Sequence, residues 1–83
     1  MKLLYFAWLR ERIGRTEEEL DVPPSVTTTS ALVEWLKARG PEYAYALAEP
    51  AAVRVAVDRV HASGDASIAG AREIAIFPPM TGG

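Results

Sequence analysis

The sequence contains no cysteine, no asparagine and no glutamine, and it contains a single histidine. Without cysteine the chain has no thiol nucleophile, no disulfide, and no ligand for an iron–sulfur cluster or a zinc knuckle. One histidine cannot build a His-rich metal site. We therefore expect no bound metal and no cysteine-based catalysis.

A strong excess of one charge and a long apolar run are also missing. Nine Lys and Arg stand against eleven Asp and Glu, for a net charge of −2, so no cationic field attracts phosphate backbones or anionic lipid. No apolar run approaches the ~20 residues of a membrane helix. The apolar segment from Leu3 to Leu9 is followed directly by Arg10, without the cleavage site of a signal peptide. We expect a cytoplasmic protein that binds neither nucleic acid nor membrane.

The missing amides come with a preference for arginine, which outnumbers lysine seven to two. This bias suits a heat-adapted protein, and a GC-rich genome produces it equally well. If heat adaptation is the cause, thermal unfolding followed by circular dichroism should have its midpoint above the ~45–65 °C of mesophilic domains. A midpoint inside that range would favour genome composition.

What the chain does contain is enough apolar sequence for one small domain. It has 83 residues, of which 49% are hydrophobic, and a domain of this size buries about 60% of its unfolded surface. Lys2 to Trp8 is apolar at nearly every position, which predicts a central strand covered on both faces. About one helical turn should follow, up to Gly14. Thr16 to Val22 then predicts an antiparallel second strand, on which Glu17-Glu18-Glu19 form a solvated face.

The middle of the chain has helical spacing. Thr27 to Ser30 offers several N-caps, and Leu32, Trp35 and Leu36 then recur at i, i+3 and i+4. Both tryptophans are expected in the core. A second helical stretch is predicted around Tyr43 to Leu47.

The remainder returns to strand patterns. Val53 to Val57 predicts a half-exposed strand that turns at Asp58-Arg59 into a short return near Val60, and Glu73 to Phe77 predicts the last strand. We interpret His61 as a surface residue rather than a general base. The order of elements predicts an α+β domain with the β-grasp arrangement of ubiquitin. Its mixed sheet would carry one main helix on one face, residues 1–77 forming the domain and residues 78–83 a flexible tail.

The end of the chain, Phe77-Pro78-Pro79-Met80-Thr81-Gly82-Gly83, is its most unusual feature. Two prolines stiffen the exit from the sheet, and two glycines leave the last atoms without side chains. Six extended residues reach roughly 20 Å, far enough to enter another protein's active site. The reactive group would be the α-carboxylate of Gly83; the alternative is a frayed terminus.

Two segments together resemble the small subunit of molybdopterin synthase, a ubiquitin-like sulfur carrier. The first is Tyr5-Phe6-Ala7-Trp8-Leu9-Arg10-Glu11 with Gly14 after it, and the second is the Phe-Pro-Pro-Met-Thr-Gly-Gly end. The length of the chain and the order of its predicted elements agree with those of this family across essentially the whole chain. The family usually has Val where Met80 stands and an acidic residue where Arg72 stands.

The resemblance implies a sulfur donor that is not an enzyme on its own. Gly83 would be adenylated by a separate ATP-using enzyme, giving a transient acyl-adenylate, and then converted to a thiocarboxylate by a sulfur-transfer enzyme. The tail residues Phe77, Pro78, Pro79, Met80, Thr81 and Gly82 would guide Gly83 into the catalytic large subunit, in a heterotetramer. There the sulfur would pass to a cyclic pyranopterin precursor of the molybdenum cofactor. The alternatives are a ubiquitin-like modifier of lysines, a thiamine-type sulfur carrier, and a binding module with an inert tail.

Overall fold

The computed structural model describes residues 1–62 and 64–79. Within them the chain forms one mixed sheet in the order β2-β1-β5-β3-β4, with helices packed against it. The described part has no helix long and apolar enough to cross a bilayer. The elements along the chain are β1 (Lys2–Tyr5), α1 (Ala7–Ile13), β2 (Glu17–Glu19), α2 (Thr29–Lys37), α3 (Pro41–Ala46), the 3₁₀ turn η1 (Pro50–Ala52), β3 (Arg54–Val57), β4 (Val60–His61) and β5 (Glu73–Phe77).

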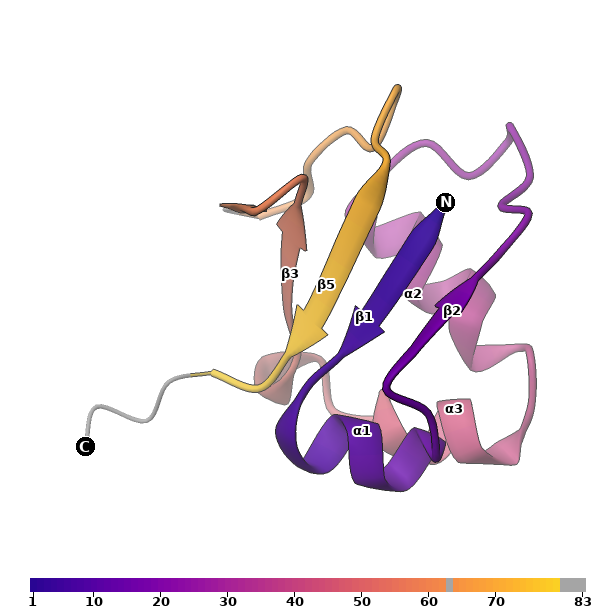
Figure 1. Cartoon of the computed structure of the whole chain (residues 1–83), viewed down its shortest axis with the longest axis vertical. Helices are drawn as coiled ribbons and strands as arrows, with labels where there is room; N and C mark the ends of the chain where they lie inside the picture. Colours follow the sequence, from indigo (N-terminus) through magenta and orange to yellow (C-terminus); the bar gives the residue numbers. More distant parts are fainter. Residues whose placement is uncertain (63, 80–83) are drawn as a thin grey trace.

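The sheet has the topology of a ubiquitin-like β-grasp, as predicted. β1 and β5 run parallel, with Leu3 opposite Ile74 and Tyr5 opposite Ile76. β2 pairs antiparallel with β1, and β3 pairs antiparallel with β5. In Figure 1, α2 and α3 lie behind the sheet, and α1 lies at the end toward which β1 and β5 point. The helices therefore leave the other sheet face, called here the open face, without a covering layer.

Alternation along the strands decides which side chains enter the core. Leu3 and Tyr5 in β1 and Ile74 and Ile76 in β5 are at most 1% exposed, whereas Leu4 and Ala75 between them are only half-buried. The fully buried strand residues pack against leucines of the helices, including Leu9, Leu32, Leu36 and Leu47. One core thus lies between the sheet and the helices, because successive strand side chains point to opposite faces.

The first strand is shorter than the apolar run that predicted it. β1 ends at Tyr5, Phe6 is the extended N-cap of α1, and Ala7 turns the chain with a φ of 54°. The prediction of a strand to Trp8, covered on both faces, was wrong. Leu9 and Ile13 lie one helical turn apart and bury the same helix face. Because the apolar run is uninterrupted, it fits this helical spacing and the alternation of a strand equally well.

The capping prediction for α2 is confirmed. The hydroxyl of Thr28 accepts a hydrogen bond from the Ala31 N–H at 3.2 Å. Asp65, from the long loop before β5, adds a second cap, since its carboxylate accepts from the Ser30 N–H at 2.9 Å. This backbone bond lowers the pKa of Asp65 below its usual value. The predicted helix around Tyr43 is also confirmed as α3.

The middle glutamate of β2 lies in a buried cluster, so the prediction that all three face solvent was wrong. The hydroxyls of Tyr5 and Tyr43 both donate to Glu18 Oε2, at 2.7 and 2.6 Å. Arg15 Nε and Arg39 Nη2 approach Oε1 at 3.7 and 3.6 Å. The pairing of Glu18 with Leu3 places it on the helix side of the sheet. The cluster therefore links β1, β2 and α3.

This cluster makes stability depend on pH in the alkaline range. Burial, followed by the hydrogen bond to Glu18, raises the pKa of Tyr5, and the same two causes raise the pKa of Tyr43. Above the ordinary tyrosine pKa of about 10, the unfolded state therefore ionises first, and the folded state loses stability as pH rises. Tyr5 should contribute about 1.4 kcal/mol per pH unit to this loss.

Urea unfolding between pH 8 and 11.5 tests the slope. Tyr5→Phe should reduce the loss of unfolding free energy per pH unit, whatever its stability at pH 8. Equal slopes for wild type and Tyr5→Phe would contradict the assignment.

Candidate functional site at the root of the C-terminal tail

The predicted tail begins at the end of β5, a strand held on both sides. The Phe6 N–H donates to the Ile76 carbonyl at 3.1 Å, and Phe77 lies opposite Arg54 of β3. β5 ends at Phe77 because Pro78 and Pro79 have no N–H with which to continue the ladder. The last residue of β5, Phe77, therefore has a fixed position and direction.

The open face changes character along β5. Toward the start of the strand it carries ion pairs, Lys2 with Glu17 at 3.4 Å and Arg59 with Glu73 at 3.7 Å. Toward the end it carries the half-buried apolar residues Leu4, Ala75 and Phe77. Phe6, one extended residue beyond β1, is 44% exposed. The apolar part, defined by Leu4, Phe6, Ala75 and Phe77 and called here the apolar patch, lies where the tail begins.

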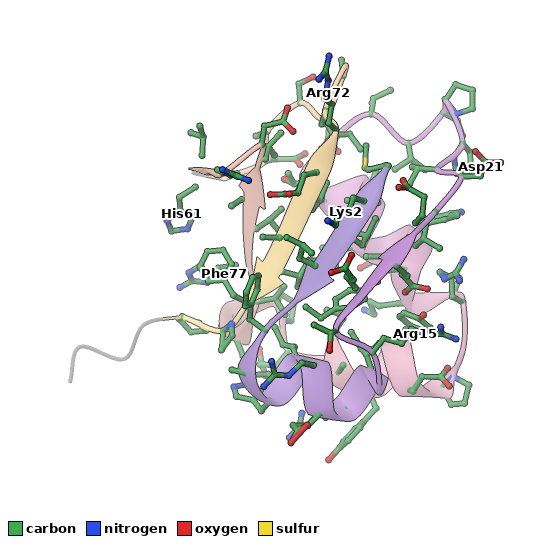
Figure 2. The ribbon with its side chains drawn as sticks, in the orientation of Figure 1. Lys2, Arg15, Asp21, His61, Arg72 and Phe77 are labelled. Carbon is green, nitrogen blue, oxygen red and sulfur yellow. The ribbon has the colours of Figure 1, made fainter. Side chains whose placement is uncertain are left out.

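Phe77 is supported from β4 by His61. The two rings meet edge to face, with centroids 5.5 Å apart and an interplanar angle of 60°. Figure 2 shows the two side chains beside each other at the edge of the sheet. The guanidinium of Arg54, opposite Phe77, donates to the carbonyls of Ala51 and Val53. Sequence reasoning placed His61 at the surface, where it is, but missed its contact with Phe77, which only the strand register creates.

The structure places three of the predicted tail residues. Phe77, Pro78 and Pro79 are half-buried at the end of the central strand. The other predicted site residues, Met80, Thr81, Gly82 and Gly83, lie outside the described residues. At the opposite end of β5, the Arg72 and Glu73 N–H groups both donate to Asp58 Oδ1 at 2.9 Å. The carboxylate of Asp58, in the turn after β3, thus holds the start of β5. Arg72 belongs to the turn before β5, where the family that the sequence resembles usually has acidic residues.

A cleft of about 480 Å³ lies among α2, β3 and β4. It is lined by apolar side chains such as Val33, Leu47 and Val53, together with Glu34, Arg54 and His61. Among residues 1–62 and 64–79, no three His, Asp or Glu side chains come together in a group that could hold a metal ion.

The parallel β1–β5 pair, the helical layer on one face, and a terminal segment that leaves the central strand define a ubiquitin-like domain. A solved structure agrees with this class. SAMP1 from Haloferax volcanii superposes with a TM-score of 0.68 at 28% sequence identity, covering all of this chain and 98% of that one.

The sequence comparisons identify the family. Residues 3–83 match the ThiS family, and the chain belongs to it. The molybdopterin synthase sulfur carrier subunit of Escherichia coli (strain K12) is 36% identical, over all of this chain and 99% of that protein. The protein of the same name from Haemophilus influenzae is 32% identical over the same shares. The resemblance inferred from the two end segments is thereby confirmed along the whole chain.

Proposed function

We propose that this chain is the sulfur carrier subunit of a molybdopterin synthase. The observation that carries the proposal is full-length similarity to two proteins of that name, at 36% and 32% identity. The Phe-Pro-Pro-Met-Thr-Gly-Gly end, which follows the central strand, supports it. The proposed place of action is the cytoplasm.

In the proposed reaction the Gly83 carboxylate acts first as a nucleophile. A separate enzyme lets it attack the α-phosphate of ATP, forming the acyl-adenylate and releasing pyrophosphate. Hydrosulfide supplied by a sulfur-transfer enzyme then attacks the acyl carbon, AMP leaves with the C–O bond that breaks, and a thiocarboxylate remains. Adenylation is needed because a free carboxylate is a poor electrophile. Since the chain has no cysteine, it cannot hold the sulfur as a persulfide of its own.

The proposed acceptor is a cyclic pyranopterin bound by a larger catalytic subunit. The thiocarboxylate sulfur attacks a carbon of the pterin precursor and an oxygen group leaves that carbon, so that a C–S bond replaces a C–O bond. Water then hydrolyses the bond between the acyl carbon and sulfur, which returns the Gly83 carboxylate and leaves the sulfur on the pterin. Two such donations supply the two sulfurs of the dithiolene. The catalytic groups belong to the large subunit, with which this chain forms a heterotetramer in the proposal. This chain positions the sulfur and holds no cofactor of its own.

The apolar patch is the proposed docking surface for that subunit. Phe6 and Phe77 are aromatic residues of the kind that anchor interfaces, and the patch continues into the predicted tail. Pro78 and Pro79 restrict the backbone at the point of exit. Docking of the open face would then direct the tail into the active site of the larger partner.

Intact mass spectrometry tests the carrier chemistry directly. The purified chain is incubated with its activating enzyme, ATP and a sulfur source. The expected result is a mass gain equal to the exchange of one oxygen for one sulfur, located in the C-terminal peptide. A chain extended by one residue after Gly83 is the matched control and should keep its mass. An unchanged wild-type mass would contradict the proposal, and attachment to lysines of other proteins would support a modifier instead.

A further inference from the structure

A second group of side chains at the tail end of the molecule has no role in the proposed sulfur chemistry. The Arg12 guanidinium lies over the Trp8 ring at 4.6 Å and over the Tyr45 ring at 4.3 Å. Trp8 lies one helical turn earlier in α1, and Tyr45 lies in α3. We call these three residues the arginine clamp.

The clamp holds the guanidinium but leaves its donors free. A planar guanidinium stacks through its faces, while its five N–H donors point outward in the plane. Within the described part of the chain, the Arg12 side chain makes no hydrogen bond or ion pair, whereas those of Arg15 and Arg39 both pair with Glu18. Arg12 is exposed and Tyr45 is 60% exposed. The N–H donors of the Arg12 guanidinium therefore face solvent and are available to a partner.

The stack prepares Arg12 for binding. Exposed cation–π contacts contribute only about 0.5–1 kcal/mol each to folding. They also restrict a flexible side chain before any partner arrives, which lowers the entropy that binding would cost. Arginine, tryptophan and tyrosine are the residue types most enriched among interface hot spots. The clamp combines all three, with Arg12 and Tyr45 exposed and Trp8 half-buried.

The clamp lies at the same end of the molecule as the proposed docking surface. Phe6 of the apolar patch is the N-cap of α1, and its N–H is bonded to β5 immediately before Phe77. Figure 1 shows α1 at the same end of the sheet at which β5 terminates. A partner broad enough to cover the apolar patch at this end would meet the clamp as well.

A carboxylate fits the clamp better than a phosphate does. Arg12 lies in the last turn of a helix, where the dipole is negative and disfavours a multiply charged anion. The guanidinium fork matches the two oxygens of a carboxylate, which carries a single negative charge where a phosphate group carries nearly two.

We propose that Arg12 is a second anchor for the large subunit, and that it binds an Asp or Glu carboxylate on the surface of that subunit through paired N–H···O bonds. This inference rests on the proposed function, because it takes the large subunit as the partner. The pair of Arg12 with this carboxylate adds an electrostatic contact outside the tail and the apolar patch. The contact favours a partner that has an acidic residue at this place and thereby selects the correct one.

Titration calorimetry of the full chain against purified large subunit tests the clamp. Arg12→Gln removes the charge and should weaken binding about tenfold or more, as expected for a lost charge-assisted bond. Arg12→Lys keeps the charge but loses the planar fork, and should weaken binding several-fold. Arg72→Gln is the matched control, since Arg72 is exposed at the opposite end of β5, as Figure 2 shows. It should bind within about twofold of wild type.

Salt and folding measurements complete the test. The difference between wild type and Arg12→Gln should shrink at 1 M salt, where the Debye length is about 3 Å. Circular dichroism confirms that each variant is folded at the titration temperature. Wild-type affinity in both Arg12 variants, or equal losses in Arg12→Gln and Arg72→Gln, would overturn the clamp while leaving the carrier function intact. Failure of the wild-type chain to bind the large subunit would instead remove the proposed function, and the clamp with it.

Discussion

Removal of Gly83 is expected to abolish sulfur transfer to the pterin precursor while the domain stays folded. The deletion moves the terminal carboxylate back by about one residue, or roughly 3.3 Å. A misplacement of only about 1 Å from a reacting centre can cost about 100-fold in rate. We therefore expect at least that loss in a single-turnover assay of dithiolene formation with purified large subunit and activating system.

Two control variants of the chain show whether the loss of sulfur transfer is specific to the Gly83 carboxylate. A chain carrying one extra residue after Gly83 should be equally inactive until it is trimmed, because its Gly83 carboxylate is held in a peptide bond. Pro24→Ala, in the exposed loop between β2 and α2, should transfer sulfur like wild type. Thermal melts should be the same for wild type, the truncated chain and the extended chain. Dithiolene formation by the truncated chain would disprove the role of Gly83.

Phe77→Ala is expected to weaken association with the large subunit by roughly thirtyfold or more. A buried aromatic anchor commonly contributes about 2 kcal/mol or more to binding, which corresponds to this factor. The domain should remain folded, because Phe77 lies on the open face and is not part of the buried core. Calorimetric titration measures the affinity, and circular dichroism monitors the fold.

The neighbourhood of Phe77 supplies a graded comparison. His61→Ala removes the ring that packs against Phe77 without removing the anchor, so we expect a smaller loss of affinity. Pro24→Ala again serves as the distant control. Unchanged affinity in Phe77→Ala would eliminate the anchor role. An unfolded variant would show that Phe77 belongs to the core of the domain.

Much of the fold could be predicted because its signals are local. The N-cap of α2 required only a hydroxyl before the stripe of Leu32 and Leu36, and β5 ended where Pro78 begins. The start of α1 could not be predicted in this way. A run of apolar residues through Tyr5 and Trp8 satisfies both a strand and a helix, and the positive φ of Ala7 that separates the two is set by packing.

Glu18 and Arg12 illustrate what local patterns miss in side-chain chemistry. Glu18 has the same neighbours in sequence as Glu17 and Glu19, yet it alone enters the tyrosine cluster. Strand alternation and the register with β1 decide this difference. Arg12 contacts a ring more than thirty positions away in α3. Neither contact has a signature in the sequence.

The sequence by itself determined the order of the elements, the apolar strands at the sheet centre and the end of the last strand before Pro78. These follow from the spacing of apolar residues and from proline, which act within a few residues. The tertiary structure alone decided which face of the sheet stays open, which glutamate is buried, and which rings surround Phe77 and Arg12. These depend on contacts between distant segments, whose geometry is set only when the helices pack on the sheet.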